Sequence, residues 1–568
     1  MKGCVIMAKE PIHRREMERA YERVSPFELK NRLIELANSG EEKSARAMLD
    51  AGRGNPNWIA ATPRESFFAL GYFALQECRR TWNERDLAGK PAAEGIAERF
   101  FAFARGAGRS LPGMDLLLRV VEWAIERKGF RPDAWVHELV DGIVGDNYPM
   151  PDRMLTHAEQ VVRDYLVQEL FGNAPAVPLQ LFAVEGATAA MCYLFETLRA
   201  NHLLNPGDQV AMMVPIFPPY VEIPQLPQYD FDVVWIHASG RAKDGSHTWQ
   251  YPREELDKLK DPRIRALFLV NPSNPPSVAL APEALEYLVQ TVRIHHPDLM
   301  IVTDDVYSTF TEHFRSLLSA LPYNTVGVYS YSKYFGVTGW RLGVIAAAED
   351  NVFDEHLRQL PEAVKQHLNR RYASLTMDPE QLRFMDRLVA DSRQVALNHT
   401  AGLSTPQQVQ MTLFSAFALL DEQNRYKQQT RDICIRRLKR LYDGLGLPVP
   451  EVPYSAHYYT EFDLGEWARL HYGDAFTAYL KANYEPVDVL FRLAEQASIV
   501  LLNGGGFTAQ RGRCASHWRT WMTTRTVKSG KRCTGRWSAM WRNGEMPQTV
   551  ESAGGPEVKE QGAVLPPC

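Results

Sequence analysis

The sequence predicts an α/β fold, with a mainly parallel sheet in a large domain, a smaller α+β domain and extra helical segments. From residue 179 onward, short apolar runs alternate with longer amphipathic ones, as strands and crossover helices do in a parallel sheet. The first hundred or so residues instead have the pattern of amphipathic helices. At 568 residues, the chain is long enough for two or more domains.

The expected strands are short and apolar. They cover residues 181–184, 209–214, 232–236, 266–270, 300–303 and 325–329. Between the fourth and fifth of these, Pro282 suits a first helical turn, and apolar residues then recur at helical spacing at Leu285, Leu288, Val289 and Val292. A helix there links two buried strands. Further helices are expected at residues 27–37 and 92–104, in a charged stretch at 349–398, and at 405–441.

These patterns divide the chain into four regions. Residues 1–115 are a helical N-terminal segment that contributes to the small domain. Residues 116–400 are the large domain, with a helical insertion at about 349–398. Residues 401–507 are the C-terminal small domain, which is expected to be truncated, and residues 508–568 are a tail.

Composition excludes several classes of function. A formal net charge of −4 gives no electrostatic footprint for nucleic acid. No stretch reaches the roughly 20 apolar residues that cross a bilayer, and the apolar run at the N-terminus is too short for a signal-peptide core. Seven scattered cysteines without a CxxC pair form neither a disulfide framework nor a zinc-ligand pattern. We therefore expect a cytoplasmic protein that binds no nucleic acid, membrane or metal.

One loop after the last expected strand brings together a hydroxyl, an amine and a guanidinium. Residues 330–343 read SYSKYFGVTGWRLG and contain Ser330, Lys333 and Arg341. A lone lysine beside serines is usually an exposed, neutral feature. The complete string favours a site instead, because its glycines permit tight turns and the planar fork of Arg341 can hold phosphate oxygens.

Polar residues also follow the neighbouring strands. Asp304 and Tyr307 lie at the end of the strand at 300–303, and Asn274 lies in the segment NPSNPPS that closes the strand before it. Each alone could be an ordinary turn. Because open α/β sheets bind ligands beyond the carboxyl ends of their strands, Asp304 and Lys333 are expected at the same edge.

Three other elements complete the candidate site. Gly186, Ala187 and Thr188 open a helix directly after a strand, and such a helix N-terminus binds anions through its free N–H groups. Phe217 lies in VPIFPPY after the next strand, and Tyr148 lies in GDNYP. An isolated aromatic residue is more often part of a core.

The string at residues 330–343 resembles the cofactor-lysine motif of fold-type I aminotransferases, which use pyridoxal 5′-phosphate (PLP). The other elements keep the family's order along residues 186–341. The resemblance implies the fold-type I architecture of PLP-dependent transferases. It also implies that Lys333 holds the aldehyde of PLP as a Schiff base. Asp304 would pair with the protonated ring nitrogen and keep the ring an electron sink.

The same resemblance implies roles for the remaining residues. Tyr307 and Asn274 would hydrogen-bond the phenolate oxygen of PLP, and Phe217 would stack on its ring. Phosphate would be bound by Gly186, Ala187, Thr188, Ser330 and Arg341. Tyr148 resembles a tyrosine that reaches the phosphate of the neighbouring subunit, which requires a homodimer.

Further stretches resemble the aspartate 4-decarboxylases within this family: residues 52–58, 145–155 and 399–408. This resemblance implies conversion of L-aspartate to L-alanine and CO2, a side transaminase activity and a larger homo-oligomer. Two alternatives stay open. One is an amino-acid aminotransferase without decarboxylation, and the other is a PLP-fold protein whose altered C-terminus impairs catalysis.

The C-terminal sequence departs from the family pattern after Phe507. The family would continue G-P-x-W-S-x-R-V-S-L-A-N-L, whose arginine holds the substrate α-carboxylate. Codons for residues 514–523, read with the frame shifted by one base, can encode R-V-S-L-A-N-L-D-D. Our hypothesis is that residues 508–568 are a frameshifted, partly disordered tail. Resequencing the gene across the codon of Phe507 tests it, and an uninterrupted frame would contradict it.

Overall fold

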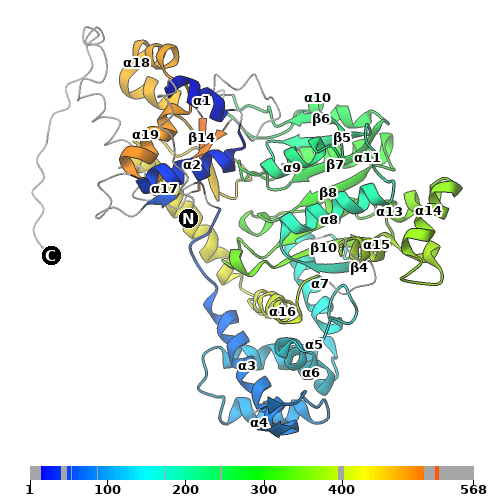
Figure 1. Cartoon of the computed structure of the whole chain (residues 1–568). Helices are drawn as coiled ribbons and strands as arrows, with labels where there is room; N and C mark the ends of the chain where they lie inside the picture. Colours follow the sequence, from blue (N-terminus) through cyan, green and yellow to red (C-terminus); the bar gives the residue numbers. More distant parts are fainter. Residues whose placement is uncertain are drawn as a thin grey trace, which may run out of the picture. The chain divides into compact units, whose positions relative to one another are not determined.

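A computed structural model describes residues 14–504, except for 23, 40–47, 51, 53, 86, 173, 244–245 and 394–401, and also residues 519–523. The chain forms two compact units (Figure 1). The sheet unit comprises Arg53–Arg436 and Pro450–Thr460, and the small unit comprises Met1–Gly52, Arg437–Val449 and Glu461–Cys568. Residues 53–115 and 401–436 thus belong to the sheet unit, whereas the sequence grouped them with the small domain.

The sheet unit contains a seven-stranded sheet in the order β4-β10-β9-β8-β7-β5-β6. All strands are parallel to one another except β10, which runs antiparallel to both of its neighbours. The predicted α/β fold is confirmed. The bounds are β4 (Leu179–Val184), β5 (Gln209–Val214), β6 (Asp232–His237), β7 (Ile264–Val270), β8 (Met300–Asp304), β9 (Thr325–Ser330) and β10 (Gly343–Ala348).

Helices bury apolar side chains against both faces of this sheet. The predicted crossover helix is α11 (Pro282–His295), which buries Leu285, Leu288 and Val292. On the other side, α8 (Ala187–Ala200) packs with α15 (Phe384–Asp391). Shorter or peripheral helices are α7 (Thr156–Leu170), α9 (Pro218–Glu222), α10 (Arg253–Leu256), α12 (Leu317–Ala320), α13 (Val352–Gln359) and α14 (Glu362–Tyr372).

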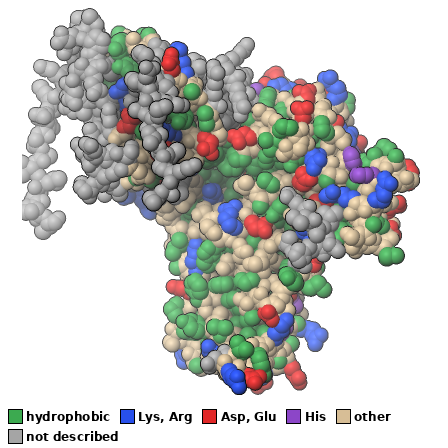
Figure 2. All heavy atoms as spheres, in the orientation of Figure 1, with side chains coloured by type: hydrophobic (Ala, Val, Ile, Leu, Met, Phe, Trp, Pro, Cys, Tyr) green, Lys and Arg blue, Asp and Glu red, His purple; other side chains and the backbone are tan. Residues whose placement is uncertain are grey.

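Four helices between residues 61 and 144 form a bundle with a core of their own. They are α3 (Ala61–Thr81), α4 (Ile96–Arg105), α5 (Met114–Lys128) and α6 (Pro132–Val144), and α16 (Thr405–Leu419) packs on α3 and α6. A short hairpin, β2 (Asn83–Glu84) and β3 (Leu87–Ala88), follows α3. This packing explains why these residues join the sheet unit. Hydrophobic side chains also lie on the surface of this bundle among charged ones (Figure 2).

The helical region predicted at 405–441 consists of two helices, since α16 ends at Leu419 and α17 (Arg425–Leu445) begins six residues later. Asn424 adopts a left-handed backbone conformation, with a φ of +52°. Asparagine tolerates that conformation better than most residues, and it cannot continue a right-handed helix. The backbone N–H of Tyr426 then donates to the Asp421 carboxylate at 2.7 Å, which satisfies one free donor of the new helix.

The small unit has its own apolar core, which includes Leu33, Trp467 and Phe491. Its helices are α1 (Arg14–Glu22), α2 (Pro26–Ser39), α18 (Leu464–Asn483) and α19 (Asp488–Ala497). Strand β1 (Leu49–Asp50) pairs in parallel with β12 (Ile499–Val500). A second sheet has the order β11 (Tyr459–Asp463), β14 (Arg519–Thr523) and β13 (Leu502–Asn503).

The predicted tail at 508–568 lies outside the described residues apart from 519–523, whose backbone forms β14. There β14 pairs antiparallel with β13. Within the described part of the chain, no helix combines the length and apolar character needed to cross a membrane.

Candidate active site

The predicted site residues converge on one edge of the sheet because of the strand register. Strands β4, β7, β8 and β9 run in parallel, so their carboxyl ends meet at the same edge. The antiparallel β10 starts where the others end, since Gly343 pairs with both Val184 and Ser330. Arg341, two residues before β10, is therefore brought to the ends of β4 and β9.

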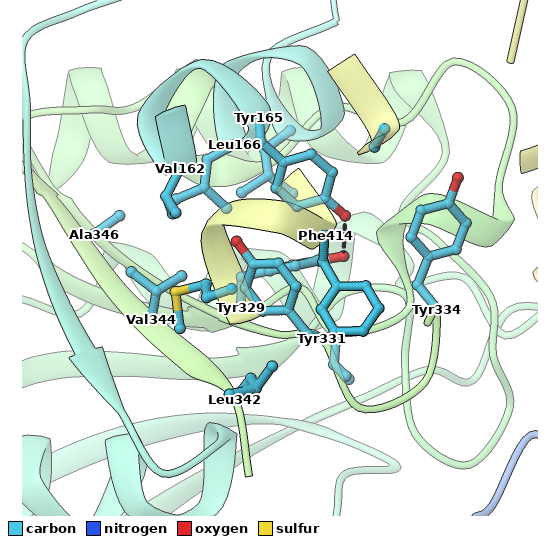
Figure 3. Close-up of a cluster of buried hydrophobic side chains, with 14 of the residues drawn as sticks. Val162, Tyr165, Leu166, Tyr329, Tyr331, Tyr334, Leu342, Val344, Ala346 and Phe414 are labelled. Atoms are coloured by element: carbon cyan, nitrogen blue, oxygen red, sulfur yellow. Dashed lines mark hydrogen bonds between the residues drawn. The ribbon is translucent and has the colours of Figure 1, made fainter. Parts of the chain in front are cut away.

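Lys333 lies in the loop after β9, and aromatic residues anchor that loop. Tyr331, Tyr334 and Phe335 are buried in the core shared by α7, β9, β10 and α16 (Figure 3). The lysine lies between these buried neighbours and is itself partly buried. Its Nζ donates to the carbonyl oxygen of Gly54 at 3.0 Å.

Residues 54–64 lie directly over the loop that carries the lysine. Trp58 Nε1 donates to the Tyr334 carbonyl at 2.9 Å, and Arg64 donates to the Gly336 carbonyl at 2.7 Å. A Cβ on Gly336, whose φ is +66°, would stand 2.0 Å from the Trp58 carbonyl oxygen. Only glycine permits this close approach of the two backbones.

The electrostatic surroundings favour a neutral amine at Lys333. Burial, assisted by the nearby Arg341 guanidinium, lowers the pKa of Lys333 to about 8, and the Asp304 carboxylate opposes this shift. Charged amines are costly to desolvate, whereas the neutral form is the nucleophile. Near neutral pH, the lowered pKa thus gives Lys333 a larger neutral, nucleophilic fraction than an ordinary lysine has.

Asp304 is a buried carboxyl at the end of β8. It accepts a hydrogen bond from the Tyr220 hydroxyl at 2.7 Å and another from the backbone N–H of Val306 at 3.1 Å. Burial raises the pKa of Asp304 to about 6, against the lowering effect of these hydrogen bonds and of Lys333. A cation placed against this carboxyl would favour its ionised form.

Arg341 and the start of α8 form a cradle for an anion. Arg341 Nη1 donates to the Thr338 carbonyl at 2.9 Å, and Nη2 donates to the Glu185 carbonyl at 3.1 Å. A Cβ on Gly186, whose φ is +91°, would lie 2.4 Å from Arg341 Nη2. The guanidinium therefore stands against the helix N-terminus, where the N–H groups of Ala187 and Thr188 lack partners within the helix.

Ser330 lies beside this cradle and is buried. Its hydroxyl donates to Ser332 Oγ at 2.9 Å, and it also lies 3.3 Å from the Leu342 carbonyl oxygen. Two serine hydroxyls on the same loop can accept and donate hydrogen bonds in either direction. They add polar groups next to the guanidinium and the helix N-terminus.

Tyr307, Phe217 and Asn274 occupy the same region. The Tyr307 hydroxyl donates to the Tyr459 hydroxyl at 3.0 Å, and burial holds the pKa of Tyr307 well above its usual value. The Phe217 ring lies edge-on to the Tyr220 ring, with centroids 5.4 Å apart. Asn274 is half-buried in the loop after β7, where the backbone N–H of Asn271 donates to the Asp304 carbonyl oxygen at 2.9 Å.

Tyr148 is the one predicted residue that is not brought together with the others. Its side chain is 71% exposed in the segment that follows α6. Among the described residues, no contact joins it to Lys333 or to the anion cradle. A role for Tyr148 within this subunit is therefore not supported.

Sequence reasoning missed Tyr220, Tyr459 and Gly54. Tyr220 lies three residues after Phe217 in a helix that begins at Pro218, so helical spacing could have placed both rings on one face. Gly54 lies in the stretch at 52–58 that resembles the decarboxylases, but no local signal marks its contact with Lys333. Tyr459 follows another tyrosine in a segment without a recognisable motif, and no local signal marked it.

The site combines a lysine of lowered pKa, a buried carboxyl and an anion cradle at the carboxyl edge of a mixed sheet. These are the groups that a PLP-dependent enzyme needs. A model of the family "Aminotransferase class I and II" matches residues 165–515. The chain belongs to this family, whose enzymes depend on PLP.

Among curated proteins, a "Bifunctional aspartate aminotransferase and L-aspartate beta-decarboxylase" from a Pseudomonas species is 51% identical over 496 residues. That alignment covers 87% of this chain and 92% of the relative. An aspartate aminotransferase of Rhizobium meliloti is 28% identical over 31% of this chain and 42% of its own length.

Solved structures agree on the fold. A Thermus thermophilus aspartate aminotransferase double mutant matches with a TM-score of 0.55 at 16% identity, covering 94% of this chain and all of that one. Bna3p, a putative kynurenine aminotransferase from Saccharomyces cerevisiae, matches with a TM-score of 0.54 at 15% identity, covering 92% and 98%. At these identities the likeness concerns the fold alone.

Proposed function

We propose that this chain binds PLP and converts L-aspartate to L-alanine and CO2 by releasing the β-carboxylate, with aspartate transamination as a side activity. The observation that carries the proposal is the 51% identity with the Pseudomonas enzyme over 87% of this chain and 92% of that protein. A match of 496 residues is longer than the sheet unit, so it extends into the small unit as well.

The residues at the sheet edge fit PLP. Lys333 would take the aldehyde, and Asp304 would hold the ring nitrogen. Tyr307 and Asn274 would bond the phenolate oxygen, and Phe217 would cover one face of the ring. The phosphate group would be held by Gly186, Ala187, Thr188, Ser330 and Arg341. Once bound, PLP supplies an electron sink for bonds at the substrate's α-carbon.

Two arguments from the described side chains support this fit. Asp304 is a buried carboxyl without a cationic hydrogen-bond partner among the described residues, so a ring cation would complete its surroundings. Gly186 leaves room for Arg341 at the start of α8, where a Cβ would collide with the guanidinium. The Asp304 carboxyl thus suits the protonated ring nitrogen of PLP, and the cradle at Arg341 suits its phosphate.

The chain's own groups then move and hold protons. With substrate and PLP bound, the neutral Lys333 amine would accept the proton of the substrate's α-carbon at Nζ, hold it there as the ammonium, and later give it back to the bound substrate. The pKa of about 8 suits this exchange, because both protonation states are populated near neutral pH. Residues 54–64 lie over the loop on one side, where Trp58 and Arg64 donate hydrogen bonds to its carbonyl groups.

The test is an assay of purified chain with L-aspartate and PLP but without added keto acid. We expect alanine and CO2 in equal amounts. Aspartate consumption that requires a keto acid and releases no CO2 would instead favour the plain aminotransferase. PLP binding without turnover of aspartate would favour the impaired protein.

We further propose that the chain works as a homodimer or larger homo-oligomer. On α3, Phe68, Tyr72 and Leu75 recur at helical spacing and are 57%, 62% and 53% exposed. Large apolar side chains gathered on one helix face mark an interaction surface. The 71% exposed Tyr148 would then reach the phosphate of a second subunit. Light scattering of the purified protein measures the assembly.

A cytoplasmic location is part of the same proposal. Its support is the cysteine pattern, which is that of a reducing compartment. Cell fractionation with an antibody against the chain tests it.

A further inference from the structure

Tyr459 places an additional hydroxyl beside the candidate cofactor lysine. It is buried, with 9% of its surface exposed, and its hydroxyl lies 3.0 Å from that of Tyr307. A Cβ built on Gly54 would stand 2.5 Å from the Tyr459 hydroxyl and 2.6 Å from Lys333 Nζ. The hydroxyl and the amine therefore face the same small space at Gly54.

The segment around Tyr459 is held in place by several hydrogen bonds. The backbone N–H of Tyr459 donates to Ser277 Oγ at 3.1 Å, and the N–H of Ala456 donates to the Ser277 carbonyl at 2.7 Å. The neighbouring Tyr458 hydroxyl donates to the Gly54 carbonyl at 2.6 Å. The Tyr459 ring packs edge-on against Tyr307, with centroids 5.6 Å apart. These contacts fix where the Tyr459 hydroxyl points.

Both tyrosines keep their protons in the physiological pH range. Burial raises the pKa of Tyr459 to about 12 and that of Tyr307 well above its usual value. A hydroxyl donates one hydrogen bond while it accepts others, and its proton can rotate. If Tyr307 turns its proton toward a ligand, Tyr459 can become the donor to the Tyr307 oxygen.

We infer that Tyr459 is a positioning residue for the cofactor's phenolate oxygen. It acts through Tyr307, because it replaces the hydrogen bond that Tyr307 gives up and polarises the Tyr307 hydroxyl. Tyr307 thereby becomes a stronger donor to that oxygen. This inference rests on the proposed function, since it requires bound PLP.

The variant that tests it is Tyr459→Phe, which keeps the ring contacts and removes only the hydroxyl. The readout is the pH titration of the visible absorption band of the bound cofactor, measured without substrate on the full chain. A hydrogen bond to the phenolate favours its charged form, so a weaker bond makes the bound cofactor hold its proton more tightly. We expect the apparent pKa of the band to rise by roughly 0.3–0.7 units.

Comparison with Tyr307→Phe shows whether the two residues act in series. We expect a larger upward shift for Tyr307→Phe, and the double variant should shift no further than Tyr307→Phe alone. Additive shifts would overturn the inference. If Tyr459→Phe does not fold, 3-fluorotyrosine at position 459 provides the second route. Its more acidic hydroxyl is a stronger donor, so the band's pKa should fall, and an unchanged pKa would contradict the inference.

Tyr165→Phe is the matched control. Tyr165 and Tyr329 form another buried pair of tyrosine hydroxyls in the sheet unit, 2.6 Å apart (Figure 3). Its loss should leave the band's pKa unchanged. If Tyr307→Phe moves the band but Tyr459→Phe does not, the inference fails and the proposed function stands. If the wild-type chain with PLP gives no such band, the proposed function fails and the inference fails with it.

Discussion

Two groups of buried or partly buried charged residues in the sheet unit differ in how completely they are paired. Asp391, at the end of α15, accepts hydrogen bonds from Arg371 at 2.8 Å, Tyr372 at 2.8 Å and Asn201 at 2.9 Å. Asp304 accepts one from a tyrosine hydroxyl and one from the backbone. Among the described residues, Lys333 forms no ion pair and donates only to a carbonyl oxygen.

Burial raises the pKa of both carboxyls, so the partners make the difference. The Asp391 group links α8, α14 and α15 and has an arginine to balance its charge. The Asp304 and Lys333 groups are shifted toward neutrality and have incomplete partners. Buried charges that are fully paired serve the fold, whereas those left incompletely paired indicate a place for a ligand.

The largest expected effect is that of Lys333→Ala. We expect loss of the visible PLP band and at least about a 10⁴-fold fall in aspartate turnover, because no other amine replaces the nucleophile. Absorption spectra and borohydride labelling measure the bond. Lys258→Ala is a matched control, since Lys258 Nζ also donates to a backbone carbonyl, that of Trp235, at 2.8 Å. A labelled Lys333→Ala protein would show that the assignment is wrong.

Asp304→Asn should lower turnover by about 10²- to 10³-fold, because the ring nitrogen loses its stabilising charge. Stability should change little, since the site carboxyl has few partners to lose. Steady-state kinetics at saturating PLP and urea unfolding measure the two effects. Unchanged turnover would contradict the view that the incompletely paired Asp304 carboxyl serves a ligand.

Asp391→Asn should instead lower stability and leave turnover almost unchanged. We expect the free energy of unfolding to fall by about 2–4 kcal/mol, because the substitution leaves Arg371 without its counter-charge. The lower part of the range reflects the partial exposure of Arg371, whose side chain is 32% exposed. Turnover per folded molecule should stay close to wild type. A loss of turnover without a loss of stability would remove the distinction between the two groups.

The smallest expected effect is a pH dependence of PLP uptake by cofactor-free chain. Because burial and Arg341 lower the pKa of Lys333 to about 8, the neutral amine predominates above pH 8. Uptake should therefore fall about tenfold per pH unit below that value and level off above it. Stopped-flow absorbance measures the rate. A rate that keeps rising to pH 10 would indicate an unshifted lysine.

The sequence predicted most of the sheet because its strands are continuous apolar runs. Strand β10 was missed, since GVIAAA consists largely of small residues and follows directly on the motif around Arg341. Lys333, Asp304 and Arg341 were recognised because each lies in a local motif. The partners Tyr220 and Tyr459 were missed because their contacts join residues 84 and 152 positions apart. Such pairs depend on the folded topology.

Residues 54–64, which lie over the lysine loop, are synthesised long before that loop. Trp58 and Arg64 leave the ribosome early, but their acceptors at Tyr334 and Gly336 are 276 and 272 positions further along the chain. At typical elongation rates, that delay is on the order of tens of seconds. During this time the early helices must remain without their final partners. Nascent chains halted before residue 334 should therefore keep the first segment accessible to proteases and chaperones.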